Sequence, residues 1–159
     1  MSALSISPAT TADAETIVAN NAAMALETEG RRLDAGVLAR GVQRVLSDPA
    51  RGVYYAARRG GTVVGQMLIT REWSDWRDGW FWWIQSVYVS PSARGEGVYR
   101  ELHAWVERLA RETPGVCGLR LYVDAQNRRA QKVYRAMGMT QTDYLLFETD
   151  WSGAPPHGG

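Results

Sequence analysis

A short glycine-containing loop stands between a predicted strand and a predicted helix. The loop, Arg94-Gly95-Glu96-Gly97, follows the β-rich run from Trp83 to Val89. From Val98 onward the apolar residues recur at helical spacing. A helix that begins after such a loop offers amide N–H groups to an anion, and glycines let the anion approach the backbone. Arg94 adds a fixed positive charge, so this stretch predicts a pyrophosphate-binding loop.

Two common phosphate-binding motifs are absent from the sequence. There is no GxxxxGK[ST], which argues against a P-loop NTPase, and no GxGxxG after a first βα turn, which argues against a Rossmann opening. The remaining pattern, P-x-x-R-G-x-G-V from Pro91 to Val98, resembles the acetyl-CoA motif R/Q-x-x-G-x-G/A of the GCN5-related N-acetyltransferase (GNAT) superfamily. Arg94 and Gly97 match this motif, whereas Tyr99 stands where the family usually has Gly or Ala.

A second stretch, from Leu121 to Met139, strengthens the resemblance. It is similar to the family block L-x-V-x-x-x-N-x-x-A-x-x-x-Y-x-x-x-G-F, with Met139 in place of the usual Phe. Asn127 at a helix start can cap the helix or offer its amide to a ligand. The resemblance implies that the Tyr134 hydroxyl protonates the thiolate that leaves when an amine attacks a thioester. The alternative for Tyr134 is an aromatic side chain packed in the core with a satisfied hydroxyl.

The resemblance also implies how acetyl-CoA is bound. In the family the strand that contains Ile84 to Val89 bulges beside the thioester, and Val87 and Val89 would contribute backbone groups that stabilise an oxyanion. The residues expected to bind acetyl-CoA are Val87, Tyr88, Val89, Arg94, Gly95, Glu96, Gly97, Val98, Tyr99, Arg100 and Asn127.

A general base is harder to assign. Many relatives have a glutamate near position 85, where this chain has Gln85, which cannot accept a proton at neutral pH. We therefore expect base catalysis to run through a water that Gln85 and a nearby acid hold. Candidate acids are Glu27, Glu29 and Asp75, each of which is otherwise a solvated surface carboxylate. Acids near the site would suit a cationic amine.

Five tryptophans lie within 11 residues, at positions 73, 76, 80, 82 and 83. We expect core packing plus a homodimer interface, and the alternative is an aromatic wall, with Trp83, for the acceptor. With only His103 and His157, and His103 expected to be exposed, we predict no metal site. Cys117 is expected to be a buried strand residue without a disulfide partner.

The order of predicted elements is β-α-α-β-β-β-α-β-α-β, which is also the GNAT order. We expect strands at 4–6, 53–58, 62–71, 80–89, 118–123 and 144–149, and helices at 10–29, 33–46, 97–112 and 127–137. The fold class is therefore α+β, a mixed and mostly antiparallel sheet flanked by helices. We expect one domain over residues 1–151 and a disordered tail over 152–159.

Composition narrows the function. The chain of 159 residues has a formal net charge of +1, so we expect no nucleic-acid or membrane partner, and a single cysteine favours the cytoplasm. We therefore predict an enzyme that transfers an acetyl group from acetyl-CoA to a primary amine by direct attack. The alternative is a CoA-binding sensor or assembly module without turnover, which Gln85 and Tyr99 favour.

Overall fold

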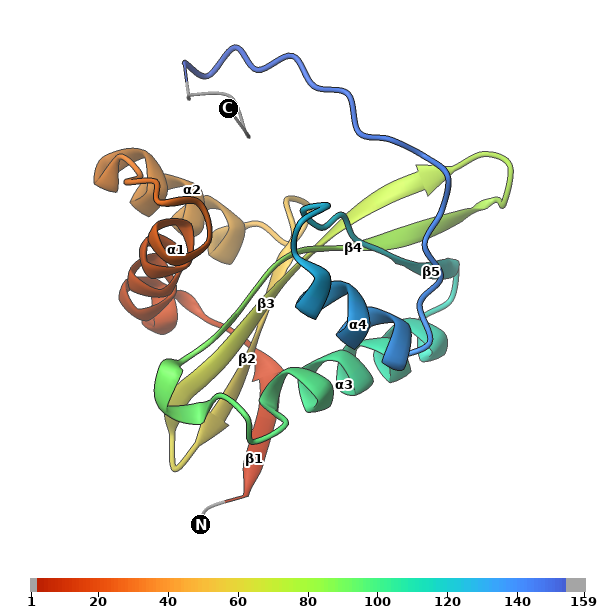
Figure 1. Ribbon diagram of the computed structural model, residues 1–159. Helices are drawn as coiled ribbons and strands as arrows, with labels where there is room; N and C mark the ends of the chain where they lie inside the picture. Colours follow the sequence, from red (N-terminus) through yellow and green to blue (C-terminus); the bar gives the residue numbers. More distant parts are fainter. Residues whose placement is uncertain (1–2, 154–159) are drawn as a thin grey trace. The chain divides into compact units, whose positions relative to one another are not determined.

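The computed structural model describes residues 3–153, and its centre is a five-stranded sheet (Figure 1). The strands are β1 (Leu4–Pro8), β2 (Val53–Arg59), β3 (Thr62–Ser74), β4 (Gly79–Val89) and β5 (Val116–Arg120), and they lie in this order across the sheet. The first four pair antiparallel, and β4 pairs parallel with β5. The predicted mixed, mostly antiparallel sheet is confirmed.

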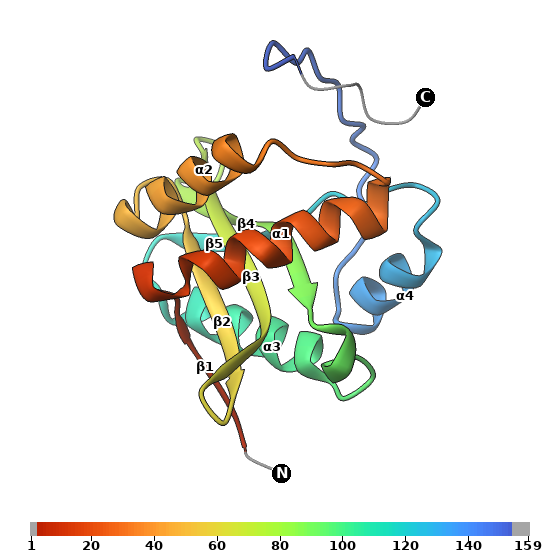
Figure 2. The ribbon, with the colours of Figure 1, turned by 90° about the vertical axis from the view of Figure 1, so that its left-hand side faces the viewer.

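Three helices cover the two faces of this sheet. Helices α1 (Ala14–Glu29) and α2 (Ala35–Ser47) lie on one face and α3 (Val98–Glu112) lies on the other (Figure 2). Ile17, Val42 and Tyr54 form a small core under α1 and α2. The larger core lies under α3, whose buried stripe includes Leu102 and Val106. Helices α2 and α3 each carry an apolar stripe and are held by burial against the sheet, whereas the buried face of α1 includes Asn21 between Ile17 and Ala25.

Helix α1 also meets the sheet through a buried chain of polar side chains. Asn20 Nδ2 donates to Gln66 Oε1 over 2.8 Å, and Gln66 Nε2 donates to Asn21 Oδ1 over 2.9 Å. Asn21 Nδ2 in turn donates to the Tyr54 hydroxyl over 3.0 Å. Buried amides are costly unless they are paired, so this chain sets the register of α1 on β2 and β3. No pattern in the sequence predicted this chain of amides.

Contacts along the chain divide it into two compact units, residues 1–123 and residues 124–159. The second unit contains α4 (Arg128–Ala136), as predicted, but the predicted strand over 144–149 does not form. Tyr144, Leu145, Leu146 and Phe147 are between 69% and 89% exposed, so these side chains bury little apolar surface that would hold a strand in place. The predicted single domain remains a prediction, and most of the predicted tail, from residue 154 on, lies outside the described residues.

Two predictions about single residues were wrong. His103 is buried rather than exposed, since it lies on the face of α3 that packs against the sheet. Cys117, on the edge strand β5, is exposed rather than buried, although its neighbours Val116 and Leu119 pack against the core. Strand β5 itself begins two residues earlier than predicted and ends at Arg120. Among the described residues, no helix is long and apolar enough to cross a bilayer.

Candidate functional site

Strand β4 contains a bulge at Gln85. Leu68 pairs with Ser86 and the next residue of β3, Ile69, pairs with Ile84, so Gln85 is the extra residue. The bulge reverses the alternation of side chains: Trp82 and Ile84 pack into the core under α3 before it, and Val87 and Val89 pack there after it. The change of phase in the sequence, from even to odd apolar positions, is a signal that could have located this bulge.

Beyond the bulge, one edge of β4 is not paired with β5. The parallel pairing between these strands covers only Trp80 to Trp83 of β4. The Ser90 amide donates to the Val64 carbonyl of β3 over 2.9 Å, and successive peptide groups of a strand point to opposite edges. The peptide groups of Val87 and Val89 therefore face away from β3, toward the unpaired edge.

The glycine loop follows this edge directly. After β4 the chain makes a 3-10 turn over Pro91–Ala93 and enters α3 at Val98. Gly95 and Gly97 have φ angles of +79° and +82°, a conformation that side chains with a Cβ rarely adopt. A Cβ on either glycine would meet no other atom within 4 Å, so backbone conformation, not crowding, requires glycine here. The first amides of α3 have no partner within the helix, which suits an anion.

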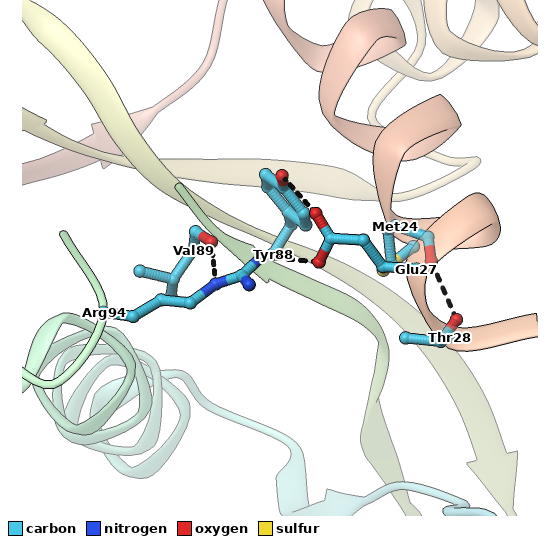
Figure 3. A network of polar contacts seen from close by, with 6 residues as sticks. All are labelled: Met24, Glu27, Thr28, Tyr88, Val89 and Arg94. Atoms are coloured by element: carbon cyan, nitrogen blue, oxygen red, sulfur yellow. Dashed lines mark hydrogen bonds and ion pairs between the residues drawn. The ribbon is translucent and has the colours of Figure 1, made fainter. Parts of the chain in front are cut away.

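Two ion pairs hold the loop. Glu96 pairs with Arg59 at the end of β2. Arg94 lies two residues before Glu96. Its Nε donates to the Val89 carbonyl over 3.0 Å, and its Nη2 donates to Glu27 Oε2 over 2.7 Å (Figure 3). Arg94 therefore connects the loop to both β4 and α1.

Tyr88 completes the contacts of Glu27. Its hydroxyl donates to Glu27 Oε1 over 3.2 Å, and the Arg94 guanidinium lies 5.5 Å from the centre of its ring. Figure 3 shows the two oxygens of the Glu27 carboxylate joined to these two side chains, one to each. Burial and the Glu27 carboxylate raise the pKa of Tyr88, so its phenol stays protonated at neutral pH.

The other two candidate acids have contacts of their own. Glu29 lies 4.0 Å from Arg31, and Asp75 accepts from the Trp76 amide in the turn between β3 and β4. That turn is roughly 30 Å along β4 from Val89, at the usual rise per residue. Glu27 contacts Tyr88 and Arg94 near the end of β4, whereas Asp75 lies far from that end.

The remaining predicted residues of unit 1 lie on β4 and α3. The ring of Trp83 lies 5.9 Å from that of Tyr122. Val98 is buried and Arg100 is exposed. The hydroxyl of Tyr99 lies 2.9 Å from His103 Nδ1, with which it shares a hydrogen bond. Tyr99, which departs from the motif, thus has a hydrogen-bond partner in a buried histidine one turn later on α3.

Asn127 and Tyr134 belong to the second unit. The side chain of Asn127 caps α4 by accepting from the Ala130 amide over 3.1 Å. Tyr134 lies two turns further along α4, and burial raises the pKa of its phenol above the ordinary value of 10.0. Their proposed roles in binding and proton transfer remain predictions.

A match to a protein-family model shows to which family the chain belongs. The acetyltransferase (GNAT) family model matches residues 14–139, which is most of the chain. The chain belongs to the GNAT family. The glycine loop, the β4 strand and α4 all fall within the matched range.

Solved structures agree with this assignment. A possible acetyltransferase from Clostridium difficile 630 is 37% identical, with a TM-score of 0.88 and coverage of 92% of this chain and 97% of that one. The ribosomal-protein-alanine N-acetyltransferase of Brucella melitensis biovar Abortus 2308 and the aminoglycoside N-acetyltransferase AAC(6')-Iy in complex with CoA share the fold. The first is 18% identical, with a TM-score of 0.74 and coverage of 94% of this chain and 100% of that one. The second is 18% identical, with a TM-score of 0.77 and coverage of 95% of this chain and 97% of that one. No functionally curated protein matches the chain significantly.

The residues of this GNAT chain fit acetyl-CoA. The unpaired edge of β4 offers peptide groups for an extended pantetheine arm, and the loop offers amides and an arginine for a pyrophosphate. No group of three or more potential metal-ligating side chains occurs in the part of the chain that the structure describes. Arg94 and Glu27, which were predicted to bind two different substrates, bind each other, and no sequence pattern indicated this pair.

Proposed function

We propose that the protein transfers an acetyl group from acetyl-CoA to a primary amine, with a small cationic or aromatic amine as the preferred acceptor. The observation that carries this proposal is the unpaired edge of β4, which follows the bulge at Gln85 and leads directly into the glycine loop. Acetyl-CoA, when bound, supplies an acetyl group activated as a thioester.

The chain's own residues divide the work. The Val87 and Val89 peptide groups hold the acetyl carbonyl and the pantetheine arm, and an N–H aimed at the carbonyl oxygen stabilises the charge that develops there. The amides of the loop and Arg94 hold the pyrophosphate. Gln85, which is exposed at the bulge, and a nearby acid orient a water that passes the proton of the amine to that acid. Tyr134 donates a proton to the departing thiolate, a role that its raised pKa supports because the phenol stays protonated.

The acceptor preference is supported by two features of unit 1. Glu27 supplies a carboxylate that already binds a cation, and Trp83 and Tyr122 form an aromatic pair on β4 and after β5.

A homodimer is also part of the proposal. It is supported by the exposed side chains of Trp73, Trp76 and Trp80 on the β3–β4 hairpin, and sedimentation velocity would measure it.

Thiol release from acetyl-CoA, measured against a panel of amines, tests the proposal. We expect release with one class of amine, and a kcat at least tenfold lower for Tyr134→Phe, about 1.4 kcal/mol of barrier. Tyr144→Phe is the matched control, because Tyr144 is an exposed tyrosine of the same unit. An unchanged kcat in Tyr134→Phe would remove Tyr134 as the acid. Tight binding of acetyl-CoA with no release from any amine would instead favour the CoA-binding module without turnover.

A further inference from the structure

Arg94 occupies a cation site that the rest of the protein builds. One side of the site is the Glu27 carboxylate, whose Oε2 lies 2.7 Å from Arg94 Nη2. The other side is the Tyr88 ring, over which the guanidinium lies at 5.5 Å. A carboxylate beside an aromatic face is the combination that binds organic cations.

The site is held in place independently of Arg94. Tyr88 is 8% exposed and is fixed by its place in β4, and its hydroxyl donates to Glu27 Oε1. When Arg94 leaves, Glu27 keeps this hydrogen bond and stays beside the ring. The carboxylate then lacks its cation.

Two partners compete for the Arg94 side chain under the proposed function, the Glu27 carboxylate and the pyrophosphate of CoA. Arg94 is the arginine of the glycine loop, which under the proposed function binds the pyrophosphate of CoA. Its pair with Glu27 is partly exposed, with 45% of the Arg94 side chain and 40% of the Glu27 side chain accessible. Exposed pairs of this kind are weak, so the pyrophosphate, which carries two negative charges, can displace the carboxylate.

We propose that Glu27 is an amine-binding residue that Arg94 blocks until CoA binds. The phosphates of CoA draw Arg94 away from Glu27, and the freed carboxylate, with the Tyr88 ring, binds the ammonium group of the acceptor. The inference rests on the proposed function and adds to it the exchange of Arg94 between Glu27 and the phosphates of CoA, which makes amine binding at Glu27 depend on CoA. By thermodynamic linkage, each substrate then strengthens the binding of the other.

The inference predicts that Glu27→Gln changes the affinities for the two substrates in opposite directions. CoA should bind about two- to fivefold more tightly, measured by isothermal titration calorimetry, because Arg94 no longer has to leave a carboxylate. The KM for a cationic amine, measured at saturating acetyl-CoA, should rise at least fivefold, because the ammonium loses its partner. A residue with a merely structural role would weaken both.

Two further variants make the test specific. Glu72→Gln is the matched control, because Glu72 forms a similar exposed pair with Arg120 at 2.6 Å, and it should leave CoA affinity unchanged. In an Arg94→Gln background, Glu27→Gln should no longer tighten CoA binding, because the effect acts through Arg94. Unfolding temperatures of all variants confirm that they fold.

The outcomes separate this inference from the proposed function. If the wild-type protein binds CoA and Glu27→Gln binds it equally or less tightly, the inference is overturned and the proposed function stands. Tighter CoA binding that persists in the Arg94→Gln background would also overturn it, since the effect would then be general repulsion between Glu27 and phosphate. If the wild-type protein binds no CoA, both fall.

Discussion

At the scale of single residues, charged and polar partners decide which groups are available for chemistry. Arg94 is held by the Val89 carbonyl and Glu27, and Glu27 is held by Tyr88. A substrate that binds here must exchange one of these contacts for its own. His103 shows the same dependence in a buried setting, where Tyr99 contacts one ring nitrogen and Glu107 lies 4.0 Å from the other.

His103 predicts a pH dependence of stability. Burial lowers its pKa below the ordinary 6.5, with Glu107 opposing the shift. Below about pH 6.5 the unfolded chain therefore takes up a proton that the folded chain does not, and the free energy of unfolding decreases as the pH falls. The slope is at most about 1.4 kcal/mol per pH unit.

Urea unfolding at pH 7.0, 6.0 and 5.5 measures this slope in the wild type and in His103→Gln. Glutamine keeps a polar partner for Tyr99 but does not titrate, so the slope that belongs to His103 should disappear. A variant with the same slope as the wild type would show that His103 does not govern stability in this range.

At the scale of elements, the site depends on how α3 and β4 meet β3. Gly65 of β3 pairs with Val89 and lies under the first turns of α3. A Cβ at this position would lie 2.8 Å from Val98 Cγ1 and 3.3 Å from Leu102 Cδ1. The absence of a side chain at Gly65 therefore lets the start of α3, and with it the glycine loop, lie close to the end of β4.

Gly65→Ala should accordingly destabilise the protein by about 1–3 kcal/mol, as overpacking of a core does, and weaken CoA binding by moving the start of α3. Gly41→Ala is its matched control. Gly41 is exposed on α2, where a Cβ meets no other atom, so alanine should stabilise the helix by about 0.5–1 kcal/mol. Chemical denaturation measures both changes. Equal stability of the Gly65→Ala variant and the wild type would contradict the close packing described here.

At the scale of the whole molecule, the family match extends over both units and the sequence predicted most elements of each. Periodicity predicted the helices, and turn residues such as Gly60-Gly61 predicted the strand ends, because these signals are local. The predicted strand over 144–149 was wrong because a strand also needs a neighbour, which composition does not reveal. The burial of His103 depended on which face of α3 meets the sheet, and the exposure of Cys117 depended on which side chains of β5 meet the core, and no local pattern encodes either.

The sequence predicted which residues belong to the candidate site, but it did not predict the contacts between them. The glycine loop and Val87 and Val89 were identified from motif and resemblance, and the structure gives their backbone geometry. The pair between Arg94 and Glu27 joins residues 67 positions apart, and no local pattern encodes it. The buried amide chain through Gln66 escaped prediction for the same reason.

The central claim is that the edge of β4 and the glycine loop bind CoA, and an amide NMR titration with CoA tests it most directly. We predict the largest shift changes at the amides of Val87, Val89 and residues 95–98. The amides of Arg77 and Asp78, in the distant turn between β3 and β4, should stay unchanged. Saturable CoA binding that leaves the chemical shifts of the Val87, Val89 and loop amides unchanged would contradict the claim.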